Sequence, residues 1–377
     1  MSLITHNPRI FYNTLSTDVN LSDDIKLWQK IYSQWGIGWF HDINDRSNNI
    51  QTPIRTYVPN RFFLPKFERS NKTYKECCSE KVYEIIQKQD HLNYPIELMY
   101  SGGIDSSNVL ISFIETIGLK ESKDRLTIVM TQESAEENPS LWKKFIRPYF
   151  RIESGSFRYH DTNKKTITVT GELNDNIFGY VPRGGNSRLY DWNPEGYKLK
   201  ANIDNIKKFM IESYKVEEHI ALSISKLLLE NLKSSPNPDP TLIEAFWWFS
   251  FTCLWIGTDL RTLMISPAED RINPSWSEEL NVSFYNSKSF QLWSMNDIEP
   301  KDLRTKNTFK WTAKKAVADF IQDQDYLYKT KNKSLRSIVS GRTAGDILGL
   351  DTDYNLIKNL DDINRYIDNK NDFSKFL

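Results

Sequence analysis

A short loop of glycines, serines and one aspartate has the composition of a phosphate-binding site. The segment Ser101-Gly-Gly-Ile-Asp-Ser-Ser107 follows a short apolar run and precedes apolar residues at helical spacing. Gly102 and Gly103 let the backbone approach an anion closely, and a helix beginning there presents free N–H groups and the positive end of its dipole. The hydroxyls of Ser101, Ser106 and Ser107 are further donors. No Gly-Lys-Ser/Thr sequence follows, so the loop is not a Walker A motif.

Asp105, inside the same loop, points to a metal ion. A carboxylate repels polyphosphate unless a hard cation such as Mg²⁺ lies between the two, and that ion prefers oxygen ligands. We therefore expect Asp105 to be a metal ligand.

The order of residues in this loop gives a more specific indication. Ser-Gly-Gly-Ile-Asp-Ser after a predicted strand resembles the signature loop of the N-type ATP pyrophosphatases, the PP-loop superfamily that includes asparagine, GMP and NAD synthetases. The resemblance implies that the loop binds ATP. Met130, at the end of the next predicted strand, is a further candidate for the ATP site.

A second motif narrows the resemblance to one branch of the superfamily. Thr170-Gly-Glu-Leu-Asn-Asp-Asn-Ile-Phe-Gly-Tyr180 is similar to the Ser-Gly-Glu-Gly-Ser-Asp-Glu-Ile/Leu-Phe-Gly-Gly-Tyr segment of the synthetase domain of asparagine synthetase. The resemblance implies that Asp175 binds Mg²⁺ together with Asp105, that Gly171 lies at the ATP site and that Glu172 lies in the substrate pocket. The two aspartates are expected to face one another at the carboxyl ends of neighbouring strands.

The second motif departs from the family on the side of the substrate pocket. Leu173 replaces a glycine, Asn174 a serine and Asn176 the second acid, and one glycine is missing before Tyr180. These changes leave both predicted metal carboxylates in place and reshape the pocket for the carboxylate substrate.

A basic segment near the C-terminus is the third candidate for the site. Residues 301–336 contain ten basic and four acidic residues, a net charge of +6. A helix is predicted from Phe309, with Lys310 and Lys314 off its apolar face, where solvated lysines are the default expectation. After that helix, Tyr328-Lys-Thr-Lys331 resembles an Arg-x-Lys segment whose lysine contacts the ATP phosphates. The resemblance implies this role for Lys331, with Lys329 at the arginine position.

The pattern of elements predicts an α/β fold. Short apolar strands at 96–100, 126–131 and 166–170 alternate with predicted helices, which indicates a parallel sheet covered on both sides. Beyond residue 200 the pattern is mostly helical, with helices expected at the ranges 203–214, 220–232, 242–264 and 309–321. We expect an N-terminal extension of unknown role at 1–72, a PP-loop ATP-binding core at 73–200 and a mainly helical region at 201–377 that completes the synthetase domain.

Composition sets limits on the protein class. The 377 residues carry 49 basic and 49 acidic side chains, and this balance disfavours a general nucleic-acid coat protein. The three cysteines form no CxxC pair, which favours a reducing, cytoplasmic setting. The most apolar stretch, 245–257, is too short to span a bilayer and is predicted to be a buried helix.

These observations together predict an ATP-dependent ligase. ATP and Mg²⁺ activate a small-molecule carboxylate as an acyl-adenylate, pyrophosphate leaves, and ammonia or an amine then forms an amide. Ser2 stands where glutamine-dependent asparagine synthetases expose a catalytic cysteine, and only 100 residues precede the loop, so we expect no glutamine hydrolysis.

Two other functions remain open at this point. A PP-loop enzyme can modify a nucleic-acid base or a peptide, and the +6 segment is the feature that favours a nucleic-acid partner. The altered second motif also permits a nucleotide-binding partner protein without catalysis.

Overall fold

The structure of the chain is a computed structural model. It describes residues 3–5, 23–37, 43–53, 56–155, 164–182, 184–264, 273, 276–296, 308–330, 349–353 and 355–357.

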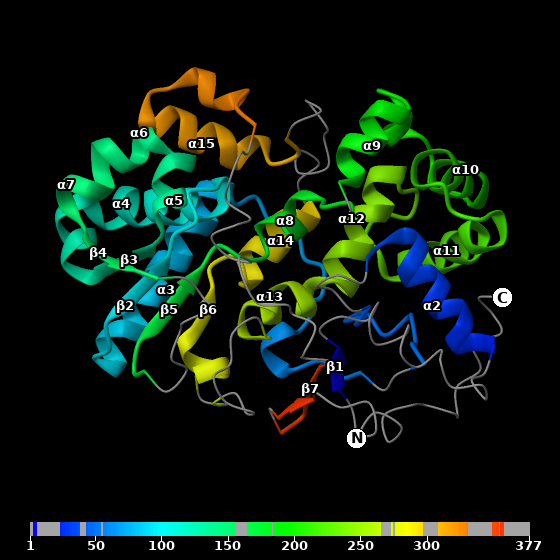
Figure 1. Ribbon diagram of the computed structural model, residues 1–377, viewed down its shortest axis with the longest axis horizontal. Coiled ribbons are helices and arrows are strands. Elements are labelled where there is room, and N and C mark those ends of the chain that lie inside the picture. The colour runs from blue at the N-terminus through cyan, green and yellow to red at the C-terminus, as the bar shows by residue number, and fades with distance from the viewer. Residues whose placement is uncertain are drawn as a thin grey trace.

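The centre of the α/β part is a five-stranded parallel sheet, in the order β4-β3-β2-β5-β6 (Figure 1). Its strands are β2 (Ile96–Met99), β3 (Leu126–Met130), β4 (Arg151–Ser154), β5 (Ile167–Thr170) and β6 (Asn281–Ser283). Leu98 of β2 pairs with Ile128 of β3 on one side and Val169 of β5 on the other. All residues of these three central strands are buried, as expected for a parallel sheet covered on both faces.

The predicted strands in the sheet are confirmed, and two further strands lie at its edges. β4 has mostly exposed residues and β6 has only three residues, so neither shows the apolar run that identified the others. An edge strand is covered on fewer sides, so its sequence need not be apolar.

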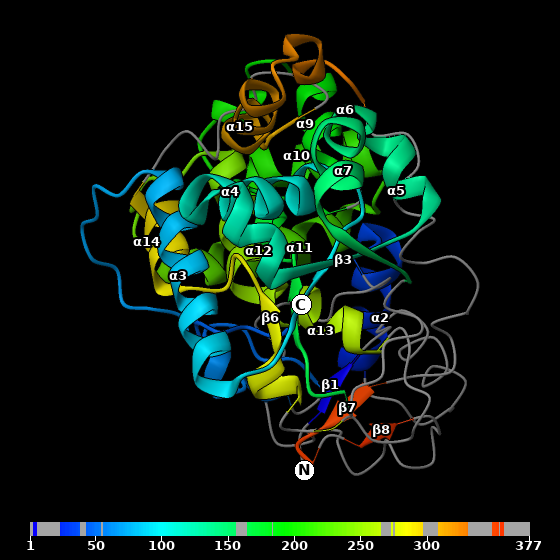
Figure 2. The same ribbon diagram turned by 90° about the vertical axis from the view of Figure 1, so that its left-hand side faces the viewer.

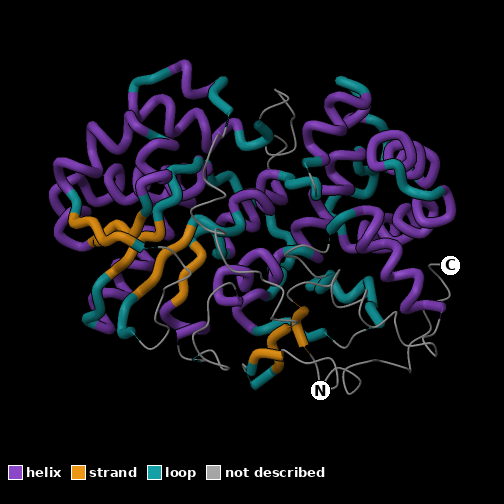
Figure 3. The backbone as a smooth tube through the Cα atoms, in the orientation of Figure 1, coloured by secondary structure: helices purple, strands orange, loops and turns teal. Residues whose placement is uncertain are grey.

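Helices surround the sheet and continue into a helical layer. They are α3 (Tyr74–Leu92), α4 (Ile104–Arg125), α5 (Gln132–Glu137), α6 (Pro139–Leu141), α7 (Arg147–Tyr149), α8 (Asn174–Phe178), α9 (Gly185–Trp192), α10 (Ile203–Tyr214), α11 (Glu218–Asn231), α12 (Leu242–Cys253), α13 (Trp255–Met264), α14 (Lys288–Asn296) and α15 (Trp311–Ile321). Figure 3 shows the parallel strands on one side of the molecule and the cluster of α9 to α12 on the other. The mostly helical character predicted beyond residue 200 is confirmed.

Two helical regions are interrupted. The region from Pro139 to Tyr149 is divided by a π-helical turn at Trp142–Ile146, which immediately precedes the short segment containing Pro148. Proline has no N–H to donate to the preceding turn, which favours such irregularity. The helix expected over 242–264 is two helices separated at Leu254, whose φ is −104° and ψ −2°.

The apolar helix α12 is buried, as predicted from its composition. Thr241 and Glu244 form a capping box that fixes its first turn. Its side chains join two hydrophobic clusters, one beneath the sheet and one within the helical layer. Among the described helices, none has the length and apolarity required to cross a membrane.

Apolar residues between Ile25 and Ile50 pack against the helical layer. The helix α2 (Asp23–Trp35) contributes Trp28 and Trp35 to the cluster around α10 to α12. Further on, the guanidinium of Arg46 is buried, donates to the carbonyl of Phe62 at 3.1 Å, and lies 4.3 Å from the ring centre of Trp255. These contacts make the N-terminal segment part of the core.

A small antiparallel sheet joins residues close to both ends of the sequence. It has the order β1 (Leu3–Thr5), β7 (Gly349–Asp351) and β8 (Leu356–Ile357). Figure 2 shows this sheet at the opposite end of the molecule from α15.

Truncation of Trp35 tests whether α2 belongs to the core. Its ring is fully buried and stacks on Phe249 with centroids 4.9 Å apart. We expect Trp35→Ala to lower the free energy of unfolding by about 3–5 kcal/mol in urea titrations. Lys30→Ala, at an exposed position of the same helix, is the matched control and is expected to change it by less than about 0.5 kcal/mol. Equal unfolding midpoints for the two variants would contradict this packing.

Candidate functional site

The two predicted motifs meet at the point where the strand order of the sheet reverses. The chain runs from β2 to β3 and β4 in one direction, and then returns to place β5 on the other side of β2. The loop at 101–103 follows β2, and the segment at 171–175 follows β5. In open parallel sheets, ligands bind at the carboxyl ends of the strands at such a switch point. The topology therefore brings both motifs to the usual ligand position of this sheet class.

The first loop is folded around its own serine hydroxyls. The backbone N–H of Ser101 donates to Oγ of Ser106 at 3.1 Å, and the hydroxyl of Ser107 donates to the carbonyl of Gly102 at 3.3 Å. Gly102 has a φ of +76°, and a Cβ there would clash with the carbonyl oxygen of Ser134. Only glycine fits this position.

The helix that follows the loop begins at a residue with no side chain. Gly103 is the N-cap of α4, so no side chain of the N-cap satisfies the first-turn amides. These amides have no acceptor within the helix. They and the helix dipole therefore form an anion-binding position at the edge of the sheet.

The second motif approaches the first loop closely. A Cβ on Gly171 would lie 2.9 Å from the backbone nitrogen of Ser106, so the two segments touch at this glycine. Leu173, which stands where the similar family has glycine, is buried with a φ of +75°. This left-handed conformation costs a non-glycine residue about 1–3 kcal/mol, and such strain is concentrated at functional sites. Leu173 therefore holds a backbone conformation that ordinarily favours glycine.

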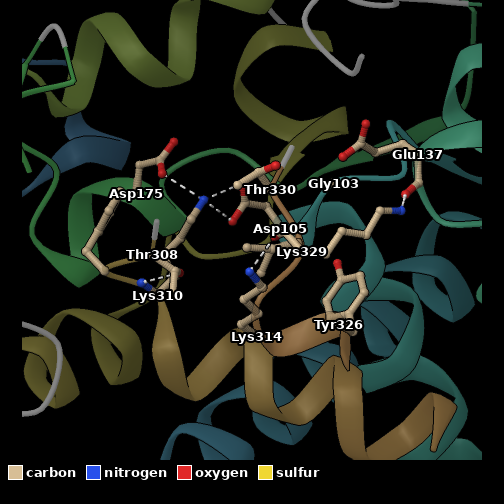
Figure 4. A pocket seen from close by; sticks show the side chains of 12 residues that line it. Gly103, Asp105, Glu137, Asp175, Thr308, Lys310, Lys314, Tyr326, Lys329 and Thr330 are labelled. Carbon is tan, nitrogen blue, oxygen red and sulfur yellow. Dashed lines mark hydrogen bonds and ion pairs between the residues drawn. The ribbon is translucent and has the colours of Figure 1, made fainter. Parts of the chain in front are cut away.

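Lys310 joins the two aspartates at the centre of the site (Figure 4). Its Nζ lies 2.7 Å from Oδ1 and 2.8 Å from Oδ2 of Asp105, and 2.7 Å from Oδ1 of Asp175. Asn174 also donates to Oδ1 of Asp105, at 2.6 Å. Asp105 and Asp175 thus face one another across a lysine ammonium.

Burial and charge act in opposite directions on Lys310. Burial by itself lowers the pKa of its ammonium, whereas the carboxylates of Asp105 and Asp175 outweigh this effect and raise the pKa above its ordinary value. The side chain is therefore protonated at neutral pH and gives the site a fixed positive charge between two negative ones.

A cavity of about 240 Å³ opens beside these charges. Nζ of Lys314 donates to the carbonyl of Lys329 at 2.7 Å, and Nζ of Lys329 donates to the carbonyl of Glu137 at 2.7 Å. Each ammonium thus has a backbone carbonyl as a hydrogen-bond partner, and both side chains line the cavity (Figure 4). The full lining is Gly103, Ile104, Asp105, Glu137, Asp175, Thr308, Phe309, Lys310, Lys314, Tyr326, Lys329 and Thr330.

The structure brings together some of the residues predicted for the site. Gly103, Asp105, Asp175 and Lys329 line the cavity, and the remaining loop residues Ser101, Gly102, Ser106 and Ser107 shape the loop beside it. Met130 and Glu172 are buried, and neither lines this cavity. Lys331 lies outside the described residues.

The expectation that Lys310 and Lys314 are solvated is wrong. They are 9% and 2% exposed, and α15 buries Lys314 together with Ala313 and Val317. The helical pattern gives the wrong prediction here because the polar side of this helix faces the cavity and not the solvent. The sequence did contain one indication of a buried lysine. Two aspartates predicted at the same edge of the sheet require a positive charge close to them.

The donor set at this position fits a magnesium ion that is shared with a phosphate ligand. Mg²⁺ in proteins is usually held by one or two carboxylates and by substrate phosphates, and it keeps several waters. Asp105 and Asp175 supply two carboxylates at the edge of the cavity. Within the described ranges there is no group of three or more His, Cys, Asp or Glu residues that would hold a metal by protein ligands alone.

Comparison with known proteins finds no matching family model, no matching curated protein and no matching solved structure. The geometry above and the sequence motifs therefore carry the functional argument.

The pH dependence of anion binding tests the role of Lys314. Burial and the nearby charge of Lys329 lower the pKa of Lys314 to about 8, so its ammonium is charged below that pH and neutral above it. We expect the affinity of this cavity for an anionic ligand, with ATP as the probe, to fall as the pH rises through about 8. Lys314→Gln is expected to bind ATP about tenfold or more weakly at neutral pH, and to lose this fall, in calorimetric titrations.

The exposed neighbour Lys315 provides the matched control. Its side chain is 57% exposed and pairs with Asp319 on the same helix. Lys315→Gln should keep the wild-type affinity and pH profile. A Lys314→Gln protein with the wild-type profile would show that another group causes the fall.

Proposed function

We propose that this chain is an ATP-dependent ligase of the PP-loop type, similar to the synthetase domain of asparagine synthetase. The observation that carries the proposal is the meeting of a Ser-Gly-Gly-Ile-Asp-Ser loop and a second aspartate across one cavity at the switch point of a parallel sheet. Its substrates are ATP, a carboxylate, and ammonia or an amine.

The phosphates of ATP are placed against the first turn of α4. The free amides after Gly103 and the hydroxyls of the loop donate to phosphate oxygens, and the dipole of the first part of α4, which is interrupted at Gly118, favours negative charge at that end. Lys314 and Lys329, which line the same cavity, supply positive charge. A polyanion at this position therefore meets donors on two sides.

Asp105 and Asp175 would hold the magnesium ion. When bound, the ion neutralises phosphate charge and orients the polyphosphate for in-line attack on the α-phosphorus. The two carboxylates come from α4 and α8, and Asn174 orients the carboxylate of Asp105 by its hydrogen bond.

The chemistry then requires positioning and charge stabilisation. An oxygen of the carboxylate substrate attacks the α-phosphorus and pyrophosphate leaves, which gives an acyl-adenylate. The nitrogen of ammonia or an amine attacks the acyl carbon, loses a proton and displaces AMP. The lysines of the cavity stabilise the charge that develops on the departing pyrophosphate. The corresponding role of Lys331 stays a prediction from the sequence.

Exchange of labelled pyrophosphate into ATP tests the adenylation step. We expect exchange that depends on one carboxylic acid. The acid must be found with a panel of candidates, because the differences at Leu173 and Asn174 alter the predicted pocket for the carboxylate substrate. Asp105→Asn is expected to reduce this exchange at least about 100-fold, since it removes charge from a metal ligand at the reacting phosphates.

The control for this variant is Asp204→Asn, an exposed position at the start of α10. It should leave the exchange unchanged. Tight ATP binding without exchange for any acid would contradict the ligase and favour a nucleotide-binding partner protein.

A further inference from the structure

The ammonium of Lys310 occupies the position between the two carboxylates proposed to hold the metal. Three carboxylate oxygens of Asp105 and Asp175 lie 2.7–2.8 Å from its nitrogen. An ammonium has three N–H donors, so these oxygens match its whole donor capacity. A magnesium ion bonds oxygens at about 2.0–2.1 Å and would need the same carboxylates.

The position of this ammonium is fixed by regular structure. Lys310 is the N-cap of α15, its backbone N–H donates to Oγ1 of Thr308 at 3.1 Å, and its carbonyl accepts the N–H of Lys314 at 2.9 Å. Its side chain is 11% exposed. The contact therefore unites the start of α15 with α4 and α8 as part of the packed structure.

Free metal ions meet an obstacle at this site. A divalent cation that enters alone must displace the ammonium, and the two positive charges repel one another at this distance. The displaced ammonium would also be left buried without its carboxylate partners, which is unfavourable. A polyphosphate in the adjoining cavity removes this obstacle, because its oxygens accept the N–H groups of Lys310.

We propose that Lys310 is a built-in counter-cation that excludes divalent metal from Asp105 and Asp175 until a polyphosphate ligand takes over its ammonium. This inference rests on the proposed function, because it takes these carboxylates as metal ligands. Metal and nucleotide then bind cooperatively, and by linkage each raises the affinity for the other by the same factor.

Binding of Mn²⁺ to the nucleotide-free protein tests the proposal directly. The loss of the free-ion signal in electron paramagnetic resonance measures the bound metal without any turnover, and a parallel titration without protein gives the Mn²⁺ that the nucleotide itself chelates, which is subtracted. We expect wild-type protein to bind Mn²⁺ weakly, and α,β-methylene-ATP to increase this affinity at least about tenfold. Lys310→Met should gain a similar increase without nucleotide, since it removes the competing charge and keeps an apolar stem of similar length.

Two variants assign the gain to this site. Lys315→Met removes an exposed lysine from the same helix and should behave as wild type. The double variant Lys310→Met/Asp175→Asn should lose the gain. Equal Mn²⁺ affinity of wild type and Lys310→Met, or a gain that survives the Asp175→Asn change, would overturn the proposal.

The titrations of wild-type protein test the exclusion of metal by Lys310 even if Lys310→Met fails to fold. Tight Mn²⁺ binding by wild-type protein without nucleotide would overturn the exclusion by itself. The result is also separable from the ligase reaction. Cooperative metal and nucleotide binding without pyrophosphate exchange would support the role of Lys310 and contradict the ligase, whereas acid-dependent exchange without cooperativity would contradict only the role of Lys310.

Discussion

The ion pairs between Lys310 and the two aspartates are the interaction on which the site depends. Asp105 and Asp175 follow neighbouring strands, so the parallel sheet by itself places two negative charges side by side. Such a pair is unfavourable unless a cation lies between the carboxylates. Lys310, at the start of α15, supplies that cation, and its contacts join α15 to the edge of the parallel sheet. The site is therefore assembled from three segments that lie far apart in the sequence.

Contacts between helices and the parallel sheet position this edge of the sheet. Helix α4 packs on β2 and β3 and on α15, so the phosphate-binding loop and Lys310 are positioned by the same helix. On the other side of the molecule, α2 and Arg46 hold the N-terminal segment against α12 and α13. The segment that the sequence left without a role thus contributes to the core.

The sequence predicted the sheet and both aspartates because these depend on local signals. Buried strands are apolar runs, and a glycine-rich turn with a carboxylate stands out in composition. The solvent exposure of Lys310 and Lys314 was predicted wrongly. Burial of a lysine depends on the elements that pack against its helix, and the spacing of residues within one helix carries no information about them. The strand β4 was missed for a related reason, since an exposed edge strand need not be apolar. Tertiary packing therefore determines which charged side chains are buried at the site, while the local sequence determines its backbone elements.

A crystal structure with α,β-methylene-ATP and Mn²⁺ would test the central claim most directly. Anomalous scattering locates the metal, and the density shows the position of the phosphates and of Lys310. We predict Mn²⁺ between Asp105 and Asp175, phosphates against the first turn of α4, and the ammonium of Lys310 on a phosphate oxygen. Nucleotide bound elsewhere, or Lys310 still joining both carboxylates beside a bound nucleotide, would contradict the account.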